Sequence, residues 1–370
     1  RLLPLIVIAI ALTDVALAAC AYQYNIAASV HARSIVEPWT ISIASLGFYF
    51  YSARDGLILS YVTAMLAAML AALWPLLRHY GLPRGWRPHP GRLWHIAVRN
   101  LPLAAADAIE WGTRRLDLAI LGLFATPSVV GIYYVAQQVA SLPQKLKTSF
   151  EPILGPVITR NLKEKNYAAI ARQVCQVGFW ITAAQAGIAL ALGIPGEGVM
   201  GLVGPNFVGG TGAMALLLAA EVVAATAVVS EAALVYVARI RNLWISLLTI
   251  GFQAAVSVGF ILAMKDLGLG QPYWAAAVAA ALMVALGASS VVKAWLLSRI
   301  LGERINNWRW ALVWAAVPAG IVGWLAIQLP EWMELLFGIP AILLTYGWVI
   351  WHKGFGPEDR VLFRRKMDPQ

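Results

Sequence analysis

The sequence predicts an all-α membrane protein that crosses the bilayer many times. Hydrophobic residues make up 60% of the 370-residue chain and charged residues only 12%, and runs of about 20 apolar residues recur along its length. A soluble domain of this size carries roughly twice that charged fraction. A membrane β-barrel would instead show alternating polarity over short segments. The composition therefore excludes both of these classes.

About eleven stretches are long and apolar enough to be membrane-spanning helices. They are expected to begin near Leu2, Trp39, Leu57, Leu101, Val129, Val174, Gly212, Leu243, Pro272, Ala311 and Trp332. The stretch from His79 to Pro90 is rich in Pro and Gly and reads as a linker. We therefore expect four regions: three helices in 1–78 that complete an N-terminal lobe, a basic cytoplasmic linker in 79–99, a six-helix lobe in 100–300, and two accessory helices with a basic tail in 301–370.

Most Lys and Arg residues fall in joints on one side of the predicted membrane, and this asymmetry predicts a cytoplasmic C-terminus. The net charge of +10 then reflects orientation, because the basic residues form no aromatic-interleaved stripe for nucleic acid. An odd number of spans that ends inside begins outside, and Arg1 opens directly on an apolar span. We expect an N-terminal truncation, with a cleaved signal peptide as the alternative.

Four ionisable residues interrupt the apolar span from Leu101 to Phe124. They are Asp107, Glu110, Arg114 and Asp117, whose spacing of three, four and three places them on one helical stripe. Each would cost about 2.5 to 3.5 kcal/mol at the bilayer centre, so the stripe should face protein or water. The alternative is a self-neutralising structural network within the bundle.

The next span continues this polar theme. Tyr134, Gln137, Gln138, Ser141 and Lys145 recur at helical spacing on one face. Pro143 should kink this helix and could aim Lys145 inward. The alternative is that Lys145 extends to the cytoplasmic headgroups.

Two acids occupy the small-residue span from Gly212 to Ala238. Glu221 and Glu231 are candidates for binding a coupling proton or sodium ion, although their spacing places them about 80° apart around the helix. Lys293 lies near a predicted cytoplasmic end, where it should extend to the headgroups. The glycine-rich segment before this span lacks a phosphate-binding GxxxxGK[ST] pattern and reads as an outer turn.

No enzymatic constellation emerges from the sequence. The five His residues have no neighbouring ligands at metal-site spacing, and no GxSxG or HExxH pattern occurs. Cys20 and Cys175 fall at predicted cytoplasmic span ends, where a disulfide would not persist. We therefore expect no catalytic residue, no metal and no cofactor.

Several runs resemble one family of membrane transporters. They are RLDLAILGLF (115–124), VGIYYVA (130–136), FEPILGPVITR (150–160) and LVGPNFVGG (202–210). In this order and spacing they resemble the polysaccharide transporters, the Wzx-type flippases of lipid-linked oligosaccharides. These belong to the multidrug/oligosaccharidyl-lipid/polysaccharide (MATE-like) superfamily. The resemblance is strongest from about Asn100 to Arg299.

The resemblance implies a two-lobe fold of about fourteen helices, of which this chain would hold helices four to fourteen. It also implies a polyprenyl-pyrophosphate-linked oligosaccharide as substrate, moved across a bacterial inner membrane by alternating access. Membrane lipids and a downstream polysaccharide polymerase would be further partners.

Particular side chains would take particular roles in such a flippase. Arg114 and Arg115 would hold the pyrophosphate, with Lys145 as a weaker candidate. Tyr134, Gln137 and Gln138 would face the sugars. The stripe acids Asp107, Glu110 and Asp117 would orient the arginines.

Two other functions stay open at this point. One is a cation-coupled multidrug antiporter of the same superfamily, which the excess of acids on the first stripe favours. The other is a membrane-embedded polysaccharide polymerase or ligase. That enzyme usually has a sizeable outer catalytic loop, whereas the predicted outer joints are short apart from residues 193–212.

Overall fold

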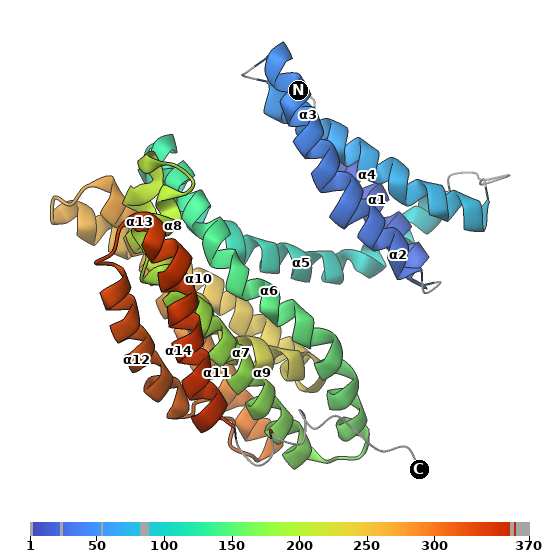
Figure 1. The fold of residues 1–370 in the computed structure, drawn as a ribbon. Coiled ribbons are helices and arrows are strands. Elements are labelled where there is room, and N and C mark those ends of the chain that lie inside the picture. The colour runs from blue at the N-terminus through green and yellow to red at the C-terminus, as the bar shows by residue number, and fades with distance from the viewer. Residues whose placement is uncertain (1–2, 23–24, 53–54, 82–88, 356–358, 360–370) are drawn as a thin grey trace, which may run out of the picture. The chain divides into compact units, whose positions relative to one another are not determined.

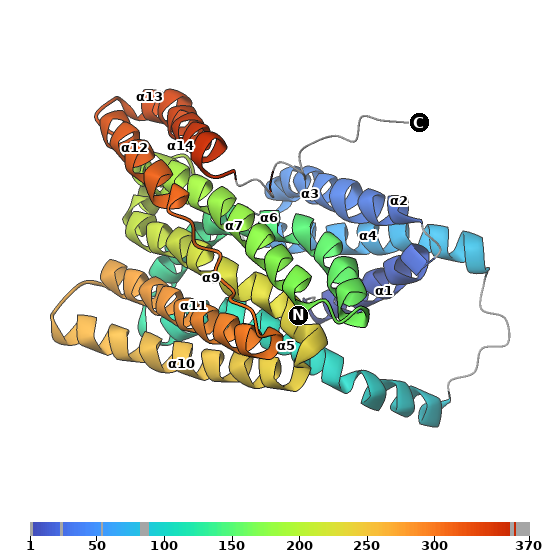
Figure 2. The same cartoon turned by 90° about the horizontal axis from the view of Figure 1, so that it is seen from below.

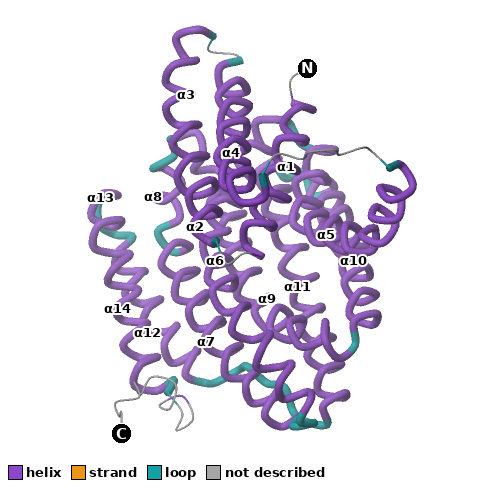
Figure 3. Tube along the Cα trace, turned by 90° about the vertical axis from the view of Figure 1, so that its right-hand side faces the viewer, coloured by secondary structure: helices purple, strands orange, loops and turns teal. Residues whose placement is uncertain are grey.

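In the computed structural model of the chain, every element of the described residues is a helix (Figure 3). The structure describes residues 3–22, 25–52, 55–81, 89–355 and 359, and for parts of α5 and α6 it describes the backbone alone. Within these residues, six helices are long and apolar enough to cross a membrane. These are the features of an all-α membrane protein, as the composition predicts. The number of spans and the two-lobe arrangement stay predictions.

The chain divides into two compact units, residues 1–97 and 98–370. In the first unit, α4 (Gly56–Tyr80) packs against α1 (Leu3–Tyr22) and α3 (Glu37–Tyr51) (Figure 1). Ala64, Ala68 and Ala72 recur every four residues along α4 and are buried. Such a row of small side chains allows neighbouring backbones to approach closely, which is how helices associate where lipid supplies no hydrophobic drive.

The second helical stretch of the first unit begins much earlier than the sequence predicts. α2 (Ile26–Ser29), the π-helix η1 (Val30–Val36) and α3 follow one another without a break. The membrane span predicted near Trp39 thus lies within a longer helical stretch, and its start in the membrane stays a prediction. Charged residues lower the hydropathy of this segment, but Arg33 is half-buried and its guanidinium binds both the Asp14 carboxylate of α1 and Glu37, the latter at 2.9 Å. A counter-charge from another helix explains why the charged turn is helical.

The second unit holds most of α5 and all later elements. In chain order these are α5 (Pro90–Phe124), α6 (Pro127–Lys163), α7 (Tyr167–Gly193), α8 (Gly196–Gly201), η2 (Pro205–Gly210), α9 (Thr211–Val237), α10 (Arg239–Asp266), α11 (Gln271–Leu301), α12 (Ala311–Ala326), α13 (Glu331–Met333), η3 (Glu334–Gly338) and α14 (Ile339–Lys353). The glycine-rich segment thus forms the two short helices α8 and η2.

Helix α9 is the centre of the second unit. It packs against α6, α7 and α11, and α10 covers the far side of α11 (Figure 2). The buried face of α9 is built largely of alanine, including Ala220, Ala225 and Ala233, which permits this crowding. α12 and α14 lie side by side, and both contact α7 (Figure 1). The accessory helices therefore attach to the bundle through α7.

Local chemistry fixes several of the helix ends. Pro127 stands in the first turn of α6, where its missing N–H is not needed. The Thr126 N–H and hydroxyl both donate to Gln271 Oε1, at 3.0 and 2.8 Å, and so tie the α5–α6 turn to the start of α11. The Asn166 side chain caps α7 by accepting from the Ala169 N–H. These contacts fix the turn between α5 and α6 against α11 and define where α7 begins.

Candidate functional site

The buried face of the α5–α6 hairpin is organised around Asp117. This residue is fully buried on α5. Its Oδ2 accepts hydrogen bonds from Tyr133 Oη at 2.8 Å and from Gln137 Nε2 at 3.0 Å, both on α6, and its Oδ1 accepts from the Leu118 N–H at 2.8 Å. A carboxylate with several donors satisfies the requirement that buried charges be hydrogen-bonded. Asp117 thus joins the two helices.

The opposite face of the same hairpin is exposed and polar. Arg115 lies two residues from Asp117, which is more than half a turn around α5, and it is exposed. Its guanidinium carbon lies 5.8 Å from the centre of the Tyr134 ring, within the range of a cation–π contact. Gln138 is exposed one turn beyond Tyr134. This set, Arg115, Tyr134 and Gln138, is called the hairpin face below.

The structure separates residues that the sequence places on one stripe. Gln137 faces Asp117 from α6, whereas Gln138 is exposed. Among the described residues no ion pair joins Asp117 to Arg115, so the predicted orienting contact between them is absent. The side chains of Asp107, Glu110, Arg114 and Lys145 lie outside the described part of the structure. Their roles stay predictions.

A second polar cluster joins three helices around Glu231. Lys293 Nζ on α11 lies 2.9 Å from Glu231 Oε2 on α9 and 3.2 Å from Ser246 Oγ on α10. Asn242 Nδ2 on α10 donates to Glu231 Oε1 at 3.2 Å. Lys293 is therefore buried within the bundle, and the prediction that it extends to the headgroups is wrong. Its ammonium finds a carboxylate and a hydroxyl on neighbouring helices instead.

The other acid of α9 lies apart from this cluster. Glu221 is half-buried on the same helix, ten residues before Glu231, or about 15 Å along the axis. A single ion bound by Glu231 could not reach it without an intervening group. The two acids are therefore separate candidates for ion coupling.

A third polar cluster fastens the chain after α14 to α7. The buried Asp359 accepts hydrogen bonds from Gln176 Nε2 at 2.9 Å and Trp180 Nε1 at 3.1 Å, and it pairs with Arg309 at 2.6 Å. Arg309 also donates to the Gly354 carbonyl at 2.8 Å and lies 4.2 Å above the Phe179 ring. The cluster thus connects α7, the joint before α12 and the end of α14.

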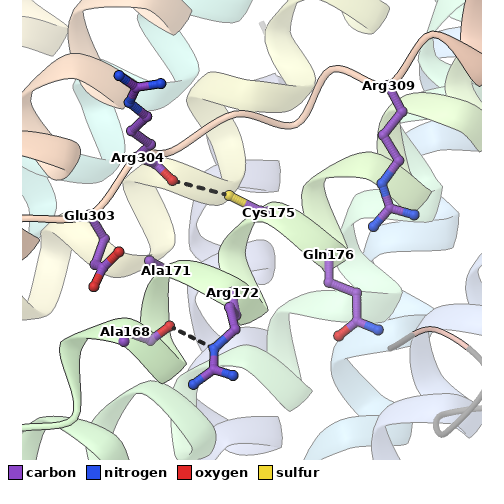
Figure 4. A pocket seen from close by; sticks show the side chains of 8 residues that line it. All are labelled: Ala168, Ala171, Arg172, Cys175, Gln176, Glu303, Arg304 and Arg309. Carbon is purple, nitrogen blue, oxygen red and sulfur yellow. Dashed lines mark hydrogen bonds between the residues drawn. The ribbon is translucent and has the colours of Figure 1, made fainter. Parts of the chain in front are cut away.

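Beside this cluster lies a cavity of about 200 Å³ (Figure 4). Its lining comes from the first turns of α7 and from the joint between α11 and α12: Ala168, Ala171, Arg172, Cys175, Gln176, Glu303, Arg304 and Arg309. In Figure 4 the Arg304 and Arg172 side chains point away from each other, and Arg309 points toward Gln176. The three guanidinium groups do not converge on one point, so the cavity is not a built anion site.

Sequence reasoning missed several partners in these clusters. Tyr133 lies sixteen residues from Asp117, and Asn242 and Lys293 reach Glu231 from other helices. One signal was present, because Tyr133 and Gln137 are four residues apart and so share a helical face. Among the described residues, no group of three His, Cys, Asp or Glu side chains could hold a metal ion.

No family model, no curated protein and no solved structure matches this chain. Function is therefore argued from the residues and their geometry.

Proposed function

We propose that this protein is a flippase that moves a polyprenyl-pyrophosphate-linked oligosaccharide from the cytoplasmic to the outer leaflet of a bacterial inner membrane. The product would supply surface polysaccharide synthesis, such as O-antigen or exopolysaccharide, and the C-terminus would be cytoplasmic. The observation that supports this proposal best is the hairpin face, which presents a cation, an aromatic ring and an amide together on the exposed side of α5 and α6.

The net charge of the hairpin face depends on which side chains bind the nearby Asp117 carboxylate. Asp117 is engaged by Tyr133 and Gln137 on the buried side of the hairpin. Within the described residues it forms no ion pair with Arg115, whose side chain stays exposed on the other side of α5. From the sequence, the excess of acids over arginine on this stripe allowed a substrate of either sign. The engagement of Asp117 favours an anionic one.

The residue types suit the proposed substrate. A guanidinium offers a planar fork of donors that matches phosphate oxygens. Sugars bind through hydroxyl groups, to which Gln138 can donate and accept, and through stacking on rings such as Tyr134. A pyrophosphate and several sugars cannot enter hydrocarbon without such replacements for water, whereas the polyprenyl tail can stay in lipid. We propose alternating access as the mechanism, with a downstream polymerase using the product.

Substitution of the two adjacent arginines, Arg114 and Arg115, tests the proposal. In the full chain, Arg114→Gln/Arg115→Gln should make the lipid-linked intermediate accumulate on the cytoplasmic side and reduce surface polysaccharide at least tenfold. Arg160→Gln is the control, because Arg160 is an exposed helical arginine whose ion pair within the described residues is with its neighbour Glu164, at 3.3 Å. Unchanged surface polysaccharide in the double variant, at equal protein level, contradicts the assignment.

A cation-coupled multidrug antiporter is the second candidate, favoured by the partly exposed carboxylate of Glu231. In that function the protein would export organic cations, and Glu231 would bind the coupling ion. Drug efflux by reconstituted protein, together with unaltered glycan export in a deletion strain, would decide for it. Accumulation of lipid-linked glycan in the deletion strain would decide for the flippase.

A further inference from the structure

The turn between α9 and α10 forms a basic pocket that the proposed transport does not use. A single residue, Ala238, separates the two helices. The pocket has a volume of about 470 Å³ and is lined by Val237, Ala238, Arg239, Ile240, Arg241 and Ile300. This volume lies within the range of small-molecule sites. Its lining places two arginines among four aliphatic or small side chains.

The two arginines of this pocket carry uncompensated charge. Both are exposed, and within the described part of the chain neither forms an ion pair or a hydrogen bond through its side chain. Glu231 lies less than two turns away on α9, but its carboxylate is engaged by Lys293 and Asn242. The pocket therefore keeps a charge of +2. It can therefore accept an anion from outside the chain.

The start of α10 adds to this positive potential. Arg239 and Arg241 occupy the first turn of a helix of 28 residues, whose first N–H groups have no partner within the helix. Such a terminus carries a partial positive charge and favours anions. Backbone and side chains thus act in the same direction at this pocket.

The surroundings indicate that the anion comes from the membrane. α10 is the least buried of the six candidate spans, so most of its surface is left exposed. Ile240 is 73% exposed, and Tyr236 and Trp244 stand exposed on either side of the turn. Exposed aromatic residues of this kind mark the headgroup level of a bilayer. An acyl chain could lie along α10 while its headgroup enters the pocket.

We propose that this pocket binds the phosphate group of an anionic phospholipid. Basic pockets between membrane helices are suited to such headgroups, and the aliphatic lining from Val237, Ile240 and Ile300 contacts the glycerol and the first methylenes. The proposal does not depend on the transported substrate. It concerns a lipid held at the periphery of the helix bundle.

Lipid binding to the purified full chain tests the proposal. Native mass spectrometry should show dioleoyl phosphatidylglycerol binding in preference to dioleoyl phosphatidylcholine. Each arginine near a membrane surface contributes enough to make the loss of both weaken binding about thirtyfold, so Arg239→Gln/Arg241→Gln should abolish the preference. The matched control is Arg160→Gln/Arg172→Gln, which removes two exposed arginines from α6 and α7 and should keep it.

Three results would overturn the proposal. The first is an unchanged preference for phosphatidylglycerol in Arg239→Gln/Arg241→Gln. The second is an equal loss of this preference in Arg160→Gln/Arg172→Gln, which would indicate a general effect of positive charge. The third is displacement of phosphatidylglycerol by a lower concentration of polyprenyl pyrophosphate, which would assign the pocket to that lipid. Equal thermal unfolding temperatures for all variants would show that the comparison concerns folded protein.

Discussion

Lys293 Nζ lies 2.9 Å from Glu231 Oε2, and this ion pair joins α11 to α9. Its two ends are not equivalent, because the Lys293 side chain is 5% exposed whereas that of Glu231 is 40% exposed. A buried charge that loses its partner is costly, since it has neither water nor a counter-charge. Removal of the Glu231 carboxylate should therefore destabilise the protein more than removal of the Lys293 ammonium.

Glu231→Gln should destabilise the protein by about 3 kcal/mol, because it leaves the buried Lys293 ammonium without a carboxylate. Lys293→Met should cost clearly less, since the Glu231 carboxylate keeps Asn242 and its partial exposure. The double variant Glu231→Gln/Lys293→Met should recover most of the loss. Unfolding in detergent would measure all three. Equal destabilisation by the two single variants would contradict the asymmetry of the pair.

Asp117 provides a second test, through two tyrosines that are neighbours in sequence. Tyr133→Phe removes the buried hydrogen bond to Asp117 and should cost about 1 to 2 kcal/mol, the range for bonds between membrane helices. Tyr134→Phe is the matched control, because Tyr134 is 44% exposed and Asp117 is bonded by Tyr133 instead. Its unfolding free energy should change by less than about 0.5 kcal/mol. A larger loss in Tyr134→Phe than in Tyr133→Phe would mean that α6 is rotated about its axis, with Tyr134 toward Asp117.

The same residues show what the sequence can and cannot predict. The all-α class follows from composition, because apolar runs of this length have few other uses. The helical state of the turn around Arg33 and the burial of Lys293 do not follow, since their counter-charges Asp14 and Glu231 stand on other helices. A hydropathy pattern scores each charge alone. It therefore treats a neutralised charge as a helix end or a headgroup contact.

The hairpin illustrates a related limit. Periodicity along α6 groups Gln137 with Gln138 as polar neighbours, but the structure turns Gln137 toward Asp117 and leaves Gln138 exposed. The rotation of a helix is set by what packs against it, and that information lies in other segments. The candidate residues of the site were thus partly predictable by type, whereas their partners were not.

Asp359 allows a test of how the accessory helices are attached. Asp359→Ala should leave Arg309 without its carboxylate and loosen the joint between α11 and α12. Cys175 Sγ contacts this joint, accepting from the Asn306 N–H at 3.3 Å. Alkylation of Cys175 should therefore accelerate several-fold, while that of the buried Cys20 stays unchanged. Asp266→Ala, which removes an exposed acid at the end of α10, should leave both rates unaltered. Slow alkylation of Cys175 in Asp359→Ala would refute the fastening role.

Gly178 of α7 lies against Asn307 of the joint before α12. A Cβ atom at this position would lie 2.1 Å from Asn307 Nδ2 and 2.4 Å from its Cγ, and Asn307 is itself buried. Gly178→Ala should therefore destabilise the protein by about 1 to 3 kcal/mol through overpacking, despite the better helix propensity of alanine. Thermal unfolding in detergent would measure this loss.

Two further variants separate overpacking from other effects at Gly178. Gly251→Ala on α10 adds a Cβ that meets nothing within 4 Å, so it should stabilise the protein by up to about 1 kcal/mol. Gly178→Ala combined with Asn307→Ala removes the side chain that the new Cβ would strike. The double variant should lose less stability than the sum of the two single losses, because Asn307→Ala removes the atoms that the new Cβ would overlap. Additive losses would show that α7 and the joint are not packed against each other at this point.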